Sequence, residues 1–250
     1  MPRFFVKNKQ VTENTIFIIG EDVKHIKNVL RRQIGDIIEI CNQENGKTYK
    51  CEISKIEEQQ IQNTIIEELQ GEAENLQVDI YQGLPKADKM ELIIQKSIEL
   101  GANAIIPVEM KRCIVKLDDK TANKKIERWQ KIAESAAKQS GRNTVPEIRN
   151  VIKIEEIAKL KDEYNSIIVC YENEKNNTLK NHLLTLKQQV TNKTNVKIAV
   201  VIGPEGGLEE KDVQDLKSVG AKIITLGKRI LRTETVALNV LSIIMYEWER

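Results

Sequence analysis

The stretch VVIGPEGGLEEKD, from Val200 to Asp212, decides the fold together with a second stretch further along, LGKRILRTETVAL from Leu226 to Leu238. Each places a glycine-bearing turn after a β-branched run, and each is followed by a helical pattern. Two such loops at the carboxyl ends of neighbouring strands would form a shallow pocket walled by backbone. A pocket of this kind suits a flat, polar cofactor.

The composition is that of a globular protein. Of its 250 residues, 30% are charged and 40% are hydrophobic, which separates the chain from disordered sequences. No apolar run approaches the roughly 20 residues that a membrane-spanning helix needs. The amino-terminal MPRFFVKNKQ lacks the long apolar core of a secretory signal. We therefore expect a cytoplasmic protein with no membrane association.

The cysteines and histidines form no metal or redox motif. The four cysteines contain no CxxC pair; they are Cys41, Cys51, Cys113 and Cys170. Zinc sites and redox motifs need closer spacing. Cys41 and Cys51 could face each other across a hairpin, but reduced strand thiols are the expectation in the cytosol. Only His25 and His182 are present, so we expect no metal site.

The basic residues gather in clusters although the net charge is only +2. A small net charge does not exclude an acidic partner, because basic residues can still share one face. The clusters are Lys7/Lys9, Lys27/Arg31/Arg32, Lys86/Lys89, Lys111/Arg112/Lys116 and Lys138/Arg142. One such cluster would be an ordinary solvated surface; five weaken that explanation without deciding the matter.

Residues 1–72 are predicted to form a small β-barrel. The strand patterns are Arg3–Val6, Thr15–Ile19, Asp36–Asn42, Thr48–Ile53 and Thr64–Leu69. Asn45-Gly46 is a strong hairpin signal, and Asp22 is predicted as the N-cap of a short helix that runs to Leu30. The polar Gly71–Asn75 is expected to link this domain to a second one over residues 73–250.

Helices alternate with strands from Gln77 onward. The predicted strands are Val78–Leu84, Ala104–Val108, Ser166–Tyr171, Lys197–Ile202 and Lys222–Leu226. The predicted helices are Asp88–Leu100, Asn123–Ser140, Ile154–Leu160, Leu179–Val190, Glu209–Val219 and Thr233–Glu249. This alternation predicts an α/β domain with a mainly parallel sheet. Ligands in such sheets lie outside the carboxyl ends of the strands, where both loops fall.

The first loop, Gly203-Pro204-Glu205-Gly206-Gly207, is not a phosphate loop. It matches neither GxGxxG nor GxxxxGK[ST], it has no lysine, and no ribose-binding acidic residue follows the next strand. Its adjacent glycines permit positive φ and a close approach of ligand to backbone. Glu205 suits a cation or an amine donor. The structural alternative is a tight strand-to-helix turn.

The second loop combines apolar and charged residues. Ile230 and Leu231 could sandwich a flat ring. Thr233 is a good N-cap for the last helix and Glu234 suits its first turn, so capping is the alternative explanation for both. Arginines 229 and 232 have no capping role. One of these two arginines is therefore expected to face substrate.

These motifs resemble the SPOUT methyltransferases, specifically the ribosomal RNA small subunit methyltransferase E family. The matching segments are HIKNVLRRQIGD (His25–Asp36), PKADKMELIIQKSIELG (Pro85–Gly101), ERWQKIAESAAKQSGRNTVPEI (Glu127–Ile148), IGPEGG (Ile202–Gly207) and LGKRILRTETVAL. They occur in the family's order and span nearly the whole chain. Ala87 and Val236 stand where glycine and alanine are expected, and Asn239 where a small residue is common; no polar group of either loop is lost.

The resemblance implies an amino-terminal PUA-like β-barrel and a carboxyl-terminal SPOUT α/β domain with a parallel sheet and a trefoil knot. It implies that the knotted loops bind S-adenosylmethionine in a bent form. The implied cofactor-binding residues are Leu84, Pro85, Ile202, Gly203, Gly207, Leu226, Gly227, Ile230, Leu231, Thr235 and Ala237. It also implies a homodimer, for whose interface the helices Asn123–Ser140 and Thr233–Glu249 are candidates.

The implied reaction is methyl transfer to N3 of one uridine in 16S ribosomal RNA of the small subunit. Uridine N3 carries a proton and is a poor nucleophile until that proton leaves, so the site must stabilise an anion, align N3 and exclude water. Arg232 is the first candidate for the stabilising charge. Glu205 and Glu234 are candidates for the base, although Glu205 could instead bind the cofactor's amino group and Glu234 could only cap a helix. No metal is needed because the sulfonium is already activated.

RNA is expected to contact the barrel and the end of the long helix. The predicted contacts are Arg3, Lys7, Arg31 and Arg32 to phosphates, and Gln139 and Arg142 toward the target nucleotide. Aromatic residues are only 4% of the chain, so recognition by RNA shape is favoured over extensive base stacking.

Two other functions fit the same loops. One is a SPOUT enzyme that methylates a ribose 2′-hydroxyl or a different base. The other is a non-catalytic RNA-binding assembly factor that keeps the fold. A nicotinamide enzyme fits poorly because the dinucleotide fingerprint is missing.

Overall fold

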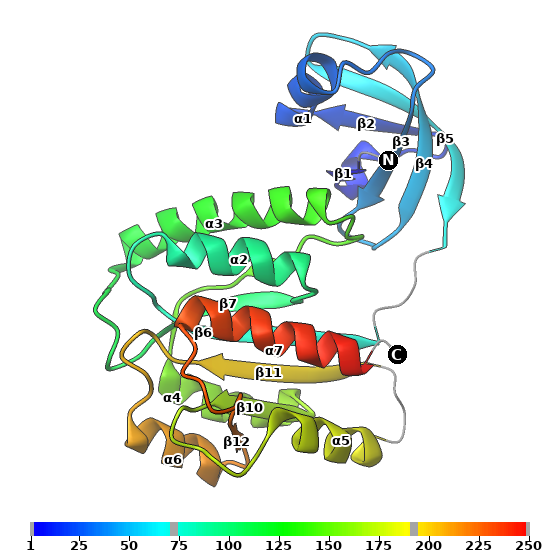
Figure 1. Cartoon of the computed structure of the whole chain (residues 1–250). Helices are drawn as coiled ribbons and strands as arrows, with labels where there is room; N and C mark the ends of the chain where they lie inside the picture. Colours follow the sequence, from blue (N-terminus) through cyan, green and yellow to red (C-terminus); the bar gives the residue numbers. More distant parts are fainter. Residues whose placement is uncertain (1–2, 71–74, 191–194, 249–250) are drawn as a thin grey trace. The chain divides into compact units, whose positions relative to one another are not determined.

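The computed structural model describes residues 3–70, 75–190 and 195–248. The chain divides into two compact units (Figure 1). The first comprises Met1–Ala73 with Ala137–Val145, and the second comprises Glu74–Ala136 with Pro146–Arg250. The predicted linker Gly71–Asn75 lies outside the described residues except for Asn75.

The first unit contains one five-stranded sheet. In sheet order its strands are β1 (Arg3–Val6), β3 (Ile37–Asn42), β4 (Thr48–Ile56), β5 (Gln60–Leu69) and β2 (Thr15–Ile19). The pair β1–β3 is parallel and the other pairs are antiparallel. Alternate residues point inward, and buried isoleucines at positions 16, 18, 38, 40, 53 and 61 fill the core. Burying each such side chain stabilises the unit by roughly 1.5–3 kcal/mol.

The short helix after β2 begins earlier than predicted. It comprises α1 (Glu21–Lys24) and a π-helical turn, η2 (His25–Val29). The N-cap is Gly20, whose φ of 77° is available to glycine at little cost. The prediction that Asp22 caps this helix is wrong, because its carboxylate instead accepts hydrogen bonds from Lys138 Nζ at 2.7 and 2.9 Å.

The second unit contains a seven-stranded sheet in which every pair is parallel. Its main path runs β12 (Lys222–Ile224), β10 (Ser166–Cys170), β11 (Val196–Ile202), β6 (Leu76–Gly83), β7 (Ala104–Glu109) and β8 (Glu147–Ile148). A short strand, β9 (Ile152–Lys153), also pairs with β7. The central strands β6 and β11 are buried almost throughout, as expected for a parallel sheet covered on both faces. The two-residue strands β8 and β9 were not predicted.

The helices of the second unit follow the predicted order. They are α2 (Lys89–Glu99), α3 (Asp119–Gln139), α4 (Ile154–Ile157) with the 3₁₀ turn η3 (Ala158–Glu163), α5 (Leu179–Gln189), α6 (Glu210–Ser218) and α7 (Thr233–Trp248). Gly101 follows α2 with a φ of 98°, as predicted for a helix C-terminus. Helix α7 lies against β6 and β11 and contacts α2 and α5 (Figure 1).

The long helix α3 begins one turn before its predicted start at Asn123. The side chain of Asp118 accepts a hydrogen bond from the amide of Thr121 at 2.7 Å. Such a bond caps a helix amino terminus, so the earlier aspartate sets the start. Trp129, Ala133 and Ala136 are buried on one side of the helix, as predicted.

The expected fold class, a parallel α/β domain after a small β domain, is confirmed. All four cysteines are free, and Cys41 lies opposite Thr48 rather than Cys51. Within the described ranges, none of the helices has the length and apolar character to cross a membrane. Those same ranges contain no cluster of three or more His, Cys, Asp or Glu side chains that could hold a metal ion.

Candidate active site

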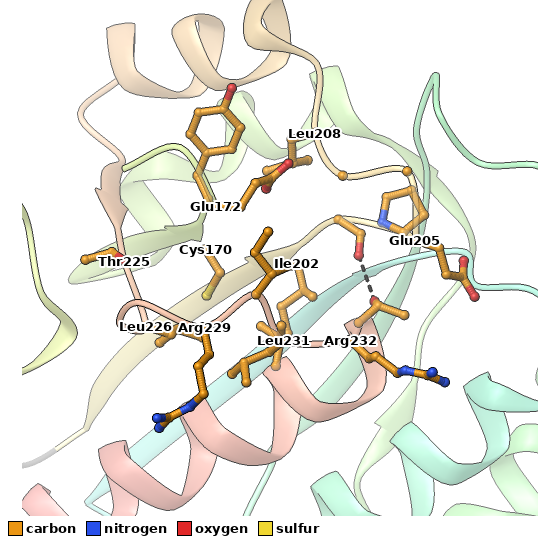
Figure 2. Close-up of a pocket in the computed structure, with 18 of the residues that line it drawn as sticks. Cys170, Glu172, Ile202, Glu205, Leu208, Thr225, Leu226, Arg229, Leu231 and Arg232 are labelled. Atoms are coloured by element: carbon orange, nitrogen blue, oxygen red, sulfur yellow. Dashed lines mark hydrogen bonds between the residues drawn. The ribbon is translucent and has the colours of Figure 1, made fainter. Parts of the chain in front are cut away.

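A cavity of about 530 Å³ lies where the loops after β10, β11 and β12 meet (Figure 2). These strands are neighbours in the sheet and run parallel, so their carboxyl ends share one edge. The volume falls within the range of small-molecule sites. Both loops identified from the sequence contribute to its walls.

The first loop forms a turn that only glycine permits. Gly207 has a φ of 71°, and a Cβ at this position would lie 2.5 Å from Glu172 Oε1. A Cβ on Gly203 would lie 3.0 Å from the carbonyl carbon of Gly207. The Gly207 amide closes the turn by donating to the Pro204 carbonyl at 2.9 Å. Neighbouring protein atoms therefore leave no room for a side chain at either position.

The outer side of the first loop is packed against the rest of the unit. A Cβ on Gly83, the last residue of β6, would lie 2.7 Å from Pro204 Cδ, so strand and loop are in direct contact. Arg112 Nη1 donates a hydrogen bond to the Gly206 carbonyl at 3.1 Å. These contacts hold the loop in one conformation.

The second loop provides the apolar part of the cavity. Leu226 and Leu231 are half-buried and line it together with Ile202 at the end of β11. Gly227 adopts a φ of 112°, and its amide donates to Thr225 Oγ1 at 3.2 Å. Ile230, predicted to cover one face of a ring with Leu231, lines the cavity but is 86% exposed.

Thr233 links the strand ends to the last helix. Its hydroxyl donates to the Gly203 carbonyl at 2.7 Å (dashed line in Figure 2) and accepts from Gln82 Nε2 at 2.8 Å. The suggested capping role is wrong, because Thr233 is the first residue of α7. The carbonyl before it, of Arg232, instead accepts from the Thr235 amide at 2.8 Å. The hydroxyl is used in a tertiary contact between both loops and β6.

A third segment, Cys170 at the end of β10 with Tyr171 and Glu172 after it, also lines the cavity and was not predicted. Glu172 has no hydrogen bond or ion pair to any residue that the structure describes, and Figure 2 shows its side chain near Leu208. Burial raises the pKa of the Cys170 thiol to about 12, so the group is neutral at physiological pH. The strand order, which places β10 beside β11, was the missing information.

Glu205 and Glu234 are both joined to Lys89. Glu205 accepts from Lys89 Nζ at 2.9 Å and from the Lys86 amide at 3.1 Å, and Glu234 Oε2 lies 3.4 Å from the same Nζ. Burial alone would raise the pKa of Glu205, but the Lys89 and backbone hydrogen bonds outweigh it and lower that pKa from its ordinary value. The sequence marked Lys89 only as part of a basic cluster, whereas it lines the cavity.

Arg229 and Arg232 are exposed residues of the cavity wall. Neither guanidinium group has a hydrogen bond or ion pair to any part of the chain that the structure describes. Figure 2 shows the two side chains pointing in different directions from either side of Leu231. Both guanidinium groups are thus free to bind an oxygen atom of an incoming ligand.

Four residues predicted to bind cofactor do not line this cavity; they are Leu84, Pro85, Thr235 and Ala237. Leu84 is buried, and its amide donates to the Val108 carbonyl at 3.0 Å. Ala237 is fully buried inside α7, and Thr235 is exposed in its first turn. The remaining predicted residues, Ile202, Gly203, Gly207, Leu226, Gly227, Ile230 and Leu231, all line it.

The residues predicted to bind RNA lie in the first unit. Arg3 is already engaged, since its Nε donates to Glu39 at 2.9 Å and its Nη1 to Asn143 at 2.9 Å. Arg32 lies 3.7 Å from Asp36. Lys7, Arg31 and Gln139 are exposed and Arg142 is half-buried. Arg31 has a φ of 51°, which is uncommon for a residue with a side chain.

Comparison with known proteins gives the class. The RNA methyltransferase domain family matches residues 72–245, and the RNA methyltransferase PUA domain family matches residues 18–66. The parallel sheet, the cavity at its carboxyl edge and these matches define the chain as an RNA methyltransferase.

Full-length relatives give the family. Proteins named ribosomal RNA small subunit methyltransferase E are 39% identical in Bacillus subtilis (100% of this chain and 98% of theirs) and 31% identical in Mesomycoplasma hyopneumoniae (97% and 98%). A crystal structure of such an enzyme from Neisseria gonorrhoeae, bound to S-adenosyl methionine, is 32% identical with a TM-score of 0.81 over 99% of this chain and 98% of that one. The chain belongs to the ribosomal RNA small subunit methyltransferase E family, as the sequence motifs predicted.

Proposed function

We propose that this protein methylates N3 of one uridine in the 16S ribosomal RNA of the small subunit, with S-adenosylmethionine as its cofactor. The observation that carries the proposal is the cavity formed by three loops at one sheet edge. The full-length relatives bear the name of a small-subunit ribosomal RNA methyltransferase, and the Neisseria structure is described as bound to S-adenosyl methionine.

The residues of the cavity fit this cofactor. Gly203, Gly206 and Gly207 line the cavity, so its wall includes backbone groups that an adenine can hydrogen-bond. Ile202, Leu226 and Leu231 supply apolar surface for its faces. Glu172 is a carboxylate that can receive hydroxyl or amino donors. Gly227 and Ile230 complete the wall. Leu84, Pro85, Thr235 and Ala237 are proposed on the family resemblance alone.

When bound, the cofactor supplies a methyl group already activated on a sulfonium. The protein's task is to make uridine N3 nucleophilic and to hold it in line. Arg232 is the residue we assign to the developing uridine anion, because it belongs to the cavity wall and its guanidinium has no partner among the described residues. Glu205 and Glu234 are the candidates that would accept the N3 proton.

RNA binding is assigned to the first unit and to residues 137–145 grouped with it. Lys7, Arg31, Arg32, Gln139 and Arg142 are the proposed contacts. Arg3 would act less directly, because its bonds to Glu39 and Asn143 occupy its guanidinium. Phosphate contacts of this kind would position the RNA, and the cavity would select the base.

Three further properties follow from the family resemblance and remain predictions. The two loops would close a trefoil knot, the protein would act as a homodimer in the cytoplasm, and the domain boundary would fall between residues 72 and 73.

The test is methyl transfer from labelled S-adenosylmethionine to small ribosomal subunits isolated from cells that lack the protein. We expect label at N3 of a single uridine. Label on a ribose 2′-hydroxyl or on another base would favour a different SPOUT specificity. Failure of calorimetry to detect S-adenosylmethionine binding would instead favour a non-catalytic assembly factor.

A further inference from the structure

Lys89 joins three chain segments at the rim of the cavity. It is the first residue of α2, and its Nζ lies 2.9 Å from Glu205 Oε1 in the first loop and 3.4 Å from Glu234 Oε2 in α7. The Lys86 amide, just before α2, adds a second hydrogen bond to Glu205. The two carboxylates, one in the first loop and one in the first turn of α7, share one ammonium group.

The backbone around Lys89 is shaped for this arrangement. Ala87 lies between the two groups that bind Glu205 and has a φ of 52°. This conformation costs an L-residue roughly 1–2 kcal/mol, and it persists only where surrounding contacts determine it. It turns the chain so that the Lys86 amide and the Lys89 side chain both meet the same carboxylate.

The charges at this junction are only partly hydrated. The exposed fractions of the side chains are 30% for Lys89, 24% for Glu205 and 16% for Glu234. Glu234 Oε2 is buried and has no hydrogen-bond partner within the described parts of the chain, which leaves Lys89 as its neutralising charge. Without Lys89, two carboxylates would face each other in a partly desolvated site, and like charges there repel.

We infer that Lys89 is a positioning residue for the methyl transfer proposed above. By binding Glu205 and Glu234 at once, it holds the first loop and the start of α7 in fixed positions beside the cofactor cavity. This inference rests on the proposed function. It means that Glu205 serves chiefly as an anchor of the glycine turn. Glu234, two positions after Arg232 in the chain, is held in place by the Lys89 ammonium group.

The contact between Lys89 and Glu205 also shifts the pKa values of both groups toward their charged forms. The bond to Glu205 raises the pKa of Lys89, and Glu234 adds to that rise. The pKa of Glu205 is lowered, as described above. Lys89 and Glu205 therefore both carry their charges over the physiological range, and their contact does not need a ligand.

The test is the affinity for S-adenosylmethionine, measured by calorimetry on Lys89→Met, Lys89→Arg and wild-type protein. We expect Lys89→Met to bind about tenfold more weakly at pH 8, a loss of about 1.4 kcal/mol, and to lose less in kcat once cofactor is saturating. Lys89→Arg should recover most of the affinity because it keeps the charge. The matched control is Lys86→Met, which removes a neighbouring lysine whose side chain takes no part in the junction.

Two readouts separate positioning from a general loss of structure. The deficit of Lys89→Met should shrink as the pH falls from about 8 to about 5.5, because one of two facing carboxyls then takes up a proton. The double variant Lys89→Met with Glu234→Gln should bind more tightly than Lys89→Met alone, since the repulsion is removed.

Unchanged affinity in Lys89→Met, or losses that simply add in the double variant, would overturn the inference. Because the readout is cofactor affinity, it is independent of which nucleotide is methylated. If wild-type protein methylates uridine N3 and Lys89→Met binds normally, only the role of Lys89 fails. If no methyl reaches uridine N3, the proposed reaction fails whatever the affinities are.

Discussion

The first and second loops border the same cavity but are held very differently. The first loop is fixed along its length, with Pro204 against Gly83, Glu205 bound to Lys89, and the Gly206 carbonyl bound to Arg112. The second is fixed at its two ends, by Thr225 and Thr233. The side chains of the arginines between those ends have no partners within the described residues. From this contrast we propose that the first loop is a preformed cradle for the cofactor and that the second is an open, charged segment that binds the substrate.

The largest expected effect is that of Arg232→Ala. If the second loop acts on the substrate, kcat should fall by about 10²–10³, the usual cost of removing one group that stabilises a developing anion. Affinity for S-adenosylmethionine should change by less than about threefold, because the first loop is untouched. Arg229→Ala is the matched control. The proposed division of roles would be wrong if Arg232→Ala weakened cofactor binding as much as turnover. The assignment of Arg232 would be wrong if Arg229→Ala alone abolished turnover.

Thr233→Val tests the tie between the two loops. The change keeps the shape but leaves the Gly203 carbonyl without its donor, and an unsatisfied buried group costs about 1–3 kcal/mol. We expect the free energy of unfolding in urea to fall by that amount. Thr233→Ser, which retains the hydroxyl, should fall by less. Equal losses in both variants would show that the methyl group, not the hydrogen bond, matters.

Gly207→Ala tests the preformed cradle. A left-handed backbone costs alanine roughly 1–2 kcal/mol, so cofactor affinity should fall about tenfold with kcat at saturating cofactor little changed. Gly220→Ala is the control, because Gly220 has a φ of 95° with nothing within 4 Å of its would-be Cβ and lies outside the cavity wall. A fall in kcat without a loss of affinity would place the first loop in the chemical step.

The smallest effect is expected at Ala87, whose φ of 52° suits glycine better. Relief of the left-handed conformation, set against the greater unfolded-state freedom of glycine, should raise the free energy of unfolding by roughly 0.5–1 kcal/mol. Ala122→Gly inside α3 should instead lower it by about 1 kcal/mol. Denaturant unfolding of both variants provides the measurement. Destabilisation by Ala87→Gly would mean that this segment is not strained.

The sequence predicted the elements well because strand and helix periodicities differ and because glycines mark the turns. It also located both loops at the carboxyl edge of the sheet. It missed Cys170-Tyr171-Glu172 because strand order is a tertiary property, and adjacent strands β10 and β11 are separated in the chain by a helix. The roles of Thr233 and Lys89 were missed for the same reason. Thr233 meets Gly203, and Lys89 meets Glu205 and Glu234, only after the chain has folded.

The departures at helix starts have a similar cause. Asp22 carries the usual signal of an N-cap, yet its side chain is recruited by Lys138, and Gly20 takes the position. At Ala87, by contrast, the structure explains an expectation drawn from the sequence. The family resemblance led us to expect glycine at this position, and the positive φ supplies the physical reason for that expectation.

The most direct test of the central claim is mass mapping of 16S ribosomal RNA from a strain that lacks this protein, complemented with wild-type or Arg232→Ala protein. The account predicts that one uridine loses its N3 methyl group in the deletion strain, regains it with the wild type, and remains largely unmethylated with the variant. If the deletion strain kept every uridine N3 methyl group in its 16S ribosomal RNA, the account would be contradicted.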